Sequence, residues 1–158
     1  MNIEKIKTSL QNLIYRLQDA EKGYQEIQNA SSNTVVNKWL DQYAKERHNM
    51  HRVLEEELTK LGGEPDVDTT LLGDLHRMFI DIKINNTSAD NEFTAVVDEI
   101  ERGATKLIDD YQKVLSDVEM PPALVTTLMG QKLLVQNELD TLTHLRDEIE
   151  EASKQTTS

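Results

Sequence analysis

Cysteine is absent from this 158-residue chain, and glycine, proline and aromatic residues are scarce. Without cysteine the chain can form no disulfide, offers no thiolate nucleophile and has no Cys-based metal site. Six glycines and three prolines, set against abundant Leu, Glu, Lys, Gln and Asp, favour an all-helical protein. No apolar run approaches the roughly 18 residues of a membrane-spanning helix.

Basic residues are also in deficit, since 17 Lys and Arg face 29 Asp and Glu and leave a net charge of −12. Such a chain lacks the clustered cations that nucleic-acid binding needs, and anionic membranes repel it. The segment 1–13 places charged and polar residues among its apolar ones, so we expect no signal peptide and a cytoplasmic protein.

What the chain does carry is a repeated apolar spacing of three and four residues, which is the period of a helix with one buried face. The central example begins at Phe93, ends at Val118 and is long enough for about seven turns. The same spacing predicts three other long helices and a shorter one. The long helices are Asn2–Ala30, Thr34–Leu61, Phe93–Val118 and Ala123–Ala152, and the short one covers residues 71–84.

Short breaks at 31–33 and 119–122 predict that the first and last pairs of long helices are antiparallel. Residues 62–88 are long enough to cross back along the bundle, so the second and third long helices would run parallel. We therefore predict one ferritin-like, up-down-down-up four-helix bundle over residues 1–152, with a disordered tail at 153–158. A simple five-helix array, with residues 71–84 as its fifth member, is the competing topology.

Five short motifs occur in order along nearly the whole chain. They resemble those of an uncharacterised bacterial family of ferritin-like four-helix-bundle proteins, a domain of unknown function. The resemblance implies the fold and carries no activity. The motifs are DAEKGY (19–24), KLGGEP (60–65), LHRMFIDIK (75–83), EIERG with a following Tyr (99–111) and LRD (145–147).

Two departures from that family remove groups able to bind a metal. Ala104-Thr105 stands where its members usually have Glu-Asp, and Leu139-Asp140 stands where they usually have His-Asp. Ferritin-like di-iron sites also need two Glu-x-x-His pairs, and this chain contains none. We therefore expect no cofactor, although Glu21, Glu101 and Glu138 are weak candidates for holding a hard divalent cation.

The histidines nearest to a Glu-x-x-His pattern are His48 and His51, which follow Glu46. His48 lies next to the inward position of Arg47, and His51 next to that of Met50. We predict that both histidines lie at the surface or at the boundary of the core rather than in a site.

Charged residues interrupt the apolar stripes at Glu21 and Arg47, and Glu101 lies beside the stripe of Phe93–Val118. A buried cation needs a partner, and the five donors of arginine match carboxylates. We therefore predict a buried ion-pair layer in which Arg47 meets Glu21 or Glu101 and occupies the place of a metal. His76, Arg77 and Asp81 form a second polar cluster, in which Arg77 and Asp81 can pair along one helix.

Two functional hypotheses follow. The first is a non-enzymatic interaction or structural protein, with a protein partner or a second copy of itself. The second is a divalent-metal-binding or redox protein of di-iron carboxylate ancestry. The residues at 104 and 139 favour the first, because neither alanine nor leucine can ligate a metal.

Overall fold

The computed structural model describes residues 1–31, 34–66 and 89–156, and in these ranges the chain is helical and contains no strand. None of the described helices is both long enough and apolar enough to cross a membrane. The predicted helix at 71–84 and the His76, Arg77 and Asp81 cluster lie outside the described residues. The helices are α1 (Ile3–Ala30), α2 (Thr34–Lys60), α4 (Ala89–Asp117) and α5 (Pro122–Thr156).

The ends of α1 and α2 follow from residues with a known role at helix termini. The Asn2 side chain accepts a hydrogen bond from the Lys5 N–H at 3.1 Å and so caps α1. After α2, Gly62 adopts a left-handed φ of +84°, and the Gly63 N–H donates to the Leu58 carbonyl at 3.0 Å. Glycine tolerates this conformation because it has no Cβ, so it can end the helix here.

The two later helices extend beyond their predicted bounds. Helix α4 begins at Ala89, ahead of the predicted start at Phe93, and α5 continues to Thr156, past the predicted end at Ala152. The polar residues at these ends lack the apolar spacing from which the bounds were predicted, yet most are compatible with helix.

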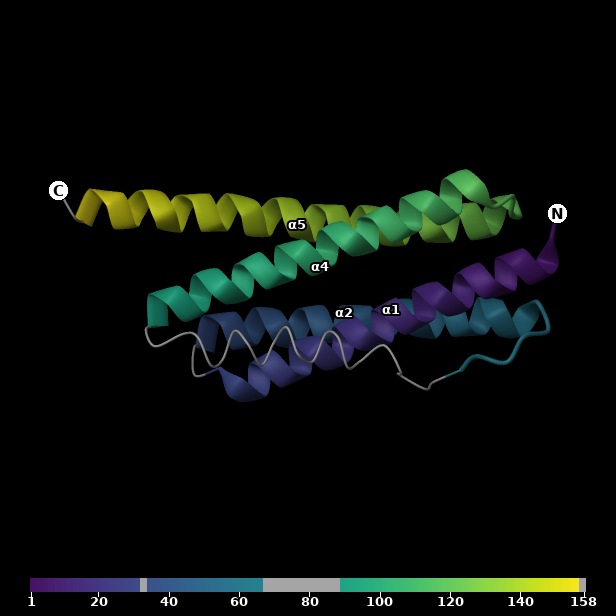
Figure 1. Cartoon of the computed structure of the whole chain (residues 1–158), viewed down its shortest axis with the longest axis horizontal. Helices are drawn as coiled ribbons and strands as arrows, with labels where there is room; N and C mark the ends of the chain where they lie inside the picture. The colour runs from purple at the N-terminus through teal and green to yellow at the C-terminus, as the bar shows by residue number, and fades with distance from the viewer. Residues whose placement is uncertain (32–33, 67–88, 157–158) are drawn as a thin grey trace.

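Figure 1 shows two antiparallel hairpins laid side by side, α1 with α2 and α4 with α5. Helices α2 and α4 run in the same direction, and α1 and α5 run in the opposite one. The four-helix bundle predicted from the apolar spacing is thus present in the described residues.

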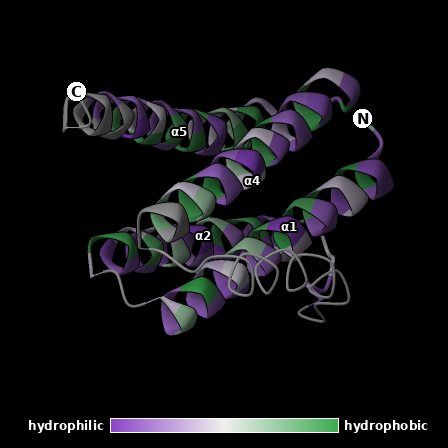
Figure 2. Ribbon diagram, turned by 60° about the vertical axis from the view of Figure 1, so that its left-hand side comes forward, coloured by the Kyte–Doolittle hydropathy of each residue, from purple (hydrophilic) through white to green (hydrophobic). Residues whose placement is uncertain are grey.

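The apolar faces of the helices turn toward one another (Figure 2), and the buried residues form two clusters along the bundle. One contains Leu17, Leu54 and Leu128, and the other contains Leu40, Val97 and Leu142. Each such side chain stabilises the fold by about 1.5–3 kcal/mol when fully buried. Polar side chains also reach the interior, chief among them Arg47, which is 1% exposed.

Candidate metal centre

Two histidines of α2 converge with one glutamate of α1 on the seam between these helices. His48 Nδ1 lies 2.9 Å from Glu21 Oε1, and His51 Nε2 lies 3.2 Å from the same oxygen. One ligand atom from each of the three residues lies within 4.8 Å of the other two. Among the described residues, this is the one group of three His, Asp or Glu side chains that meets so closely.

Helix geometry brings these side chains together. Residues three apart on a helix point to the same side, so His48 and His51 form one ligand pair, with ring centroids 5.0 Å apart. On α1, Glu21 follows the buried Leu17 by four residues and precedes the buried Tyr24 by three. Glu21 therefore lies at the edge of the apolar stripe of α1, and there it faces α2.

A second carboxylate orients His51. Its Nδ1 lies 3.2 Å from Glu55 Oε2, one turn further along α2, while its Nε2 faces Glu21. Histidines that bind metals usually donate their other ring nitrogen to a carboxylate or carbonyl, which fixes the ring and strengthens it as a ligand. Glu55 would serve His51 in this way.

Burial is graded across the seam. The side chain of His51 is 8% exposed and that of Glu21 13%, whereas that of His48 is 55% exposed. The carboxylate and one imidazole are thus held by packing, and the other imidazole lies at the water side. A metal could enter from solvent without any opening of the bundle.

The residues fit a tetrahedral metal site. At ligand distances of about 2.0–2.2 Å from zinc, neighbouring ligand atoms lie roughly 3.4 Å apart. The two separations from Glu21, 2.9 and 3.2 Å, are close to this value, and the two imidazole nitrogens lie within 4.8 Å of each other, so side-chain movements alone could close the site around a metal. Two imidazole nitrogens and one carboxylate oxygen suit Zn²⁺ and similar transition metals better than Mg²⁺ or Ca²⁺.

The predicted partners of Arg47 require correction. Its guanidinium Nη2 donates to Glu138 Oε2 of α5 at 2.7 Å rather than to Glu21 or Glu101. On the α1 side its Cζ lies 5.8 Å from the centre of the Tyr24 ring, so an aromatic face occupies the place predicted for Glu21. Glu21 lies one turn away from that ring and is turned toward the histidines.

Glu101 is also engaged elsewhere, because it accepts hydrogen bonds from Thr143 and Arg146 of α5. The three carboxylates named as weak metal candidates, Glu21, Glu101 and Glu138, therefore face three different sets of partners. The structure does not bring them together. Ala104 is buried in the apolar core, and Leu139 packs against its edge.

The His48 and His51 pair is the part of the site that sequence reasoning missed. His51 is buried against two carboxylates, contrary to the prediction, whereas His48 lies at the surface as predicted. The available signal was the spacing His-x-x-His, which places two imidazoles on one side of a helix. A prediction based on Glu-x-x-His, the pattern of a dinuclear iron site, does not include this pair.

One further buried acid lies on α1, two residues before Glu21. Asp19 is fully buried, and within residues 1–31, 34–66 and 89–156 neither of its carboxylate oxygens has a hydrogen-bond partner. Burial raises the pKa of the Asp19 carboxyl from 3.8 to about 6, against the opposing influence of Arg16 and Lys22. Asp19 is not a member of the Glu21, His48 and His51 group found among the described residues.

A groove of about 470 Å³ lies between α1 and α4, and its lining includes Lys5, Arg16, Asp110 and Lys113. Its charges are largely satisfied within the chain. Arg16 pairs with Asp110 at 3.3 Å, and Lys5 donates to the carbonyl of Asp117 at 3.1 Å. The groove therefore presents no set of converging free ligands comparable to that in the α1–α2 seam.

No curated protein matches this chain. A family described as a domain of unknown function, DUF2383, matches residues 5–117. The matched segment includes all four residues of the seam and ends with α4, so that α5 lies beyond it. Since this match covers more than half of the sequence, the chain belongs to the DUF2383 family.

Proposed function

We propose that this protein binds one divalent transition-metal ion in the seam between α1 and α2. The observation that carries the proposal is the convergence of Glu21, His48 and His51, whose ligand atoms lie within 4.8 Å of one another. Glu55 supports the centre by holding Nδ1 of His51.

The donor set favours Zn²⁺ or a metal of similar preference. Three protein ligands leave a fourth tetrahedral position for water or an exchangeable ligand, and half-exposed His48 keeps that side in contact with solvent. Such a centre suits reversible binding and transfer of a metal. We assign it no reaction.

A dinuclear iron centre does not fit the interior of this bundle, although the order of the helices supports a ferritin-like fold. The interior ligand positions hold alanine at 104 and leucine at 139, and the guanidinium of Arg47 lies between the helices. A fixed positive charge there would repel a cation. The proposed centre is thus mononuclear and lies at the edge of the bundle.

The direct test is calorimetric titration of the metal-free protein with zinc, with cobalt, manganese and magnesium compared in parallel. We expect about one equivalent of zinc to bind and the affinity for magnesium to be far lower. His51→Asn and Glu21→Gln should each weaken zinc binding at least 100-fold, since each removes a ligand. Glu55→Gln should weaken it about 10- to 100-fold, as the loss of a residue that orients a ligand does.

Two matched variants make the test specific. His144→Asn removes an exposed histidine of α5 that pairs with a glutamate four residues away, and it should leave zinc binding unchanged. Glu101→Gln removes an acid of the predicted interior site and should also have no effect. Zinc binding that survives His51→Asn, or that is lost in Glu101→Gln, would refute the centre in the seam.

A thermal measurement gives a second readout. Zinc at 100 times its dissociation constant should stabilise the wild-type fold by about 2.7 kcal/mol, because it binds only the folded state. The melting temperature of His51→Asn should not respond to zinc. An equal rise in both proteins would mean that zinc binds elsewhere.

A second candidate function is that of a structural or interaction protein without a metal. The buried Arg47–Glu138 pair favours it, because this pair fills the middle of the bundle with opposite charges in direct contact. The two functions are compatible, since the pair and the seam use different residues. The same titration separates them, because a protein with only a structural role would bind no zinc.

A further inference from the structure

The outward face of α5 differs from the other helix surfaces that the structure describes. It exposes three large apolar side chains within six residues, with Met129 57%, Leu133 55% and Leu134 38% exposed. Met129 and Leu133 are four apart and so lie one above the other on the helix. We call the surface formed by Met129, Gly130, Leu133 and Leu134 the α5 patch.

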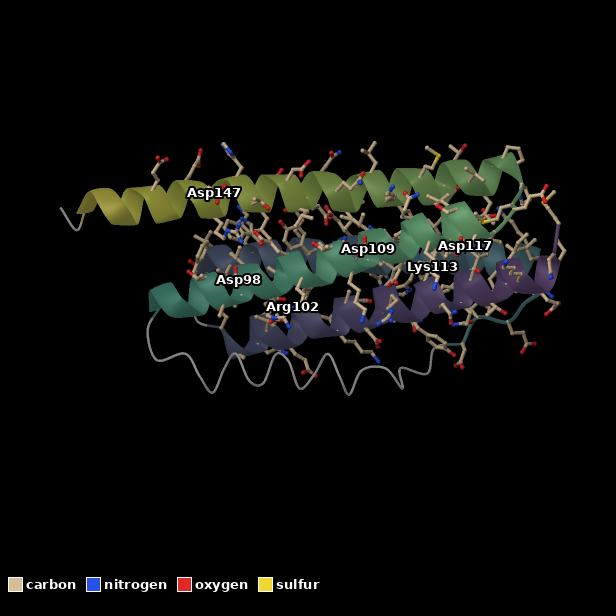
Figure 3. The ribbon with its side chains drawn as sticks, turned by 45° about the horizontal axis from the view of Figure 1, so that its top comes forward. Asp98, Arg102, Asp109, Lys113, Asp117 and Asp147 are labelled. Carbon is tan, nitrogen blue, oxygen red and sulfur yellow. The ribbon has the colours of Figure 1, made fainter. Side chains whose placement is uncertain are left out.

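The α5 patch lies in a stretch almost free of charge. Between Pro122 and Asn137 the only charged residue is Lys132, and its ammonium group bonds to Gln112 of α4. Helix α4 is the contrast, because charged and exposed side chains follow one another along it (Figure 3). These are Asp98, Arg102, Asp109, Lys113 and Asp117.

Gly130 is a second, independent feature of the patch. A glycine inside a helix weakens it relative to alanine, so its presence calls for a reason. Packing within the chain does not supply one, because a Cβ added at Gly130 would meet nothing within 4 Å apart from its chain neighbours and the adjoining backbone of α5. An exposed glycine does allow another backbone to approach closely.

We propose that the α5 patch is the contact between two copies of this chain, related by a two-fold axis near Gly130. In a two-fold contact the same patch meets itself, so a charged patch would place like charges opposite each other. An uncharged apolar patch avoids this repulsion. The net charge of −12 opposes contact through most other surfaces and thus favours the α5 patch for self-association.

The contact is small, so the dimer is weak. One helix face per copy buries less than the roughly 1,200–2,000 Å² of a standard stable interface. We therefore expect a dissociation constant in the micromolar range. Salt should tighten the dimer, because it screens the repulsion between two copies of a chain with net charge −12.

The test is sedimentation velocity of the full chain over a micromolar concentration series, with EDTA present so that metal plays no part. The wild type should shift from the 18.1 kDa monomer toward twice that mass as its concentration rises. Leu133→Glu and Met129→Glu should each weaken the dimer at least tenfold. Val35→Glu, which places the same charge at an exposed apolar position of α2, should not.

A pair of glycine variants separates self-association from folding. Gly130→Ala should raise the melting temperature and weaken the dimer, since a methyl group obstructs close approach. Gly103→Ala is the matched control, because Gly103 is also exposed in a helix with no atom within 4 Å of an added Cβ. It should raise the melting temperature and leave the dimer intact.

Two outcomes would overturn the proposal. One is a wild type that remains monomeric throughout the series at both low and high salt. The other is a dimer that survives Leu133→Glu and Met129→Glu, which would mean that the contact lies elsewhere. Neither outcome bears on the metal centre, which lies on α1 and α2 and is measured separately.

Discussion

The seam between α1 and α2 and the middle of the bundle both place a carboxylate against nitrogen donors, with opposite consequences. In the seam, Glu21 faces two imidazoles, one of which is open to solvent. In the middle, Glu138 faces the guanidinium of Arg47, which is almost fully buried. The first group holds the ligand atoms of the metal centre that we propose, whereas in the second the two charges already neutralise each other.

The partner of the carboxylate therefore decides what each region can do. Imidazole has a lone pair to give to a metal when it is neutral, and guanidinium keeps its charge and has no acceptor atom. An arginine opposite a carboxylate thus repels a cation, while a pair of neutral histidines offers two lone pairs that can bind one. We expect changes in the middle to alter stability and changes in the seam to alter metal binding.

The largest effect should come from Arg47→Met, which removes the cation and leaves Glu138 without its partner. We expect the free energy of unfolding to fall by about 3–5 kcal/mol, the usual loss when one member of a buried pair is deleted. Urea unfolding measures this change. The double variant Arg47→Met with Glu138→Leu should be more stable than Arg47→Met alone, because it also removes the buried carboxylate that has lost its partner.

Zinc titration of the same variants tests whether the two regions are separate. We expect the folded double variant to bind zinc as the wild type does, since no seam residue has changed. A large loss of zinc affinity would show that the middle of the bundle holds the seam in place, and our separation of the two would be wrong.

A smaller effect is expected from Asp19→Asn, which tests a buried carboxyl whose oxygens accept no hydrogen bond from the described residues. The pKa of Asp19 is about 6 in the fold and 3.8 in its absence, so the folded state retains the proton to higher pH. Its contribution to the free energy of unfolding therefore decreases as pH rises from about 4 to about 6, by at most ~3 kcal/mol. The amide cannot ionise, so the variant should be more stable than wild type at pH 7.5, by about 1–2 kcal/mol.

Thermal unfolding at pH 4.5 and pH 7.5 measures this difference. Near pH 4.5 the two proteins should be almost equally stable, because the Asp19 carboxyl is then protonated in the fold. Asp109→Asn, at an exposed position on α4, is the control for the loss of one negative charge. A stability gain of Asp19→Asn that is the same at both pH values would contradict the assignment.

The smallest effect is expected from Tyr111→Phe in the middle of the bundle. The Tyr111 hydroxyl donates to Gln131 Oε1 at 2.5 Å, and Gln131 Nε2 donates in turn to the Met50 carbonyl at 3.1 Å. Deleting the hydroxyl leaves a buried acceptor without a donor, which should cost about 1 kcal/mol in urea unfolding. Zinc affinity should not change, and a change would indicate coupling between the regions.

Apolar spacing was enough to predict the four long helices, because each buries one face and the spacing records that face. The Phe93–Val118 stripe predicted α4 to within a few residues of its end. The start of α4 and the end of α5 were missed, since residues there are helical without belonging to an apolar stripe. Termini depend on local polar interactions that the stripe does not encode.

The site was harder to predict, because the choice among neighbouring charged residues depends on helix rotation and height. Glu21 and Arg47 both interrupt apolar stripes, and sequence alone does not tell whether they meet. In the structure the Tyr24 ring lies beside Arg47 instead, and Glu138, 91 positions further along the chain, supplies the carboxylate. The His-x-x-His spacing can be read from the sequence, but only the packing of α1 against α2 brings Glu21 to the two histidines.

The separation of contacts along the chain has a consequence for the order of folding. Glu21 and His51 lie 30 residues apart, whereas Arg47 and Glu138 lie 91 apart. Closing the shorter loop loses less chain entropy, and contacts between near segments form sooner. The α1–α2 hairpin can therefore bring the three ligands of the proposed metal centre together while α5 is still undocked, and if zinc binds there it should accelerate the early steps of refolding.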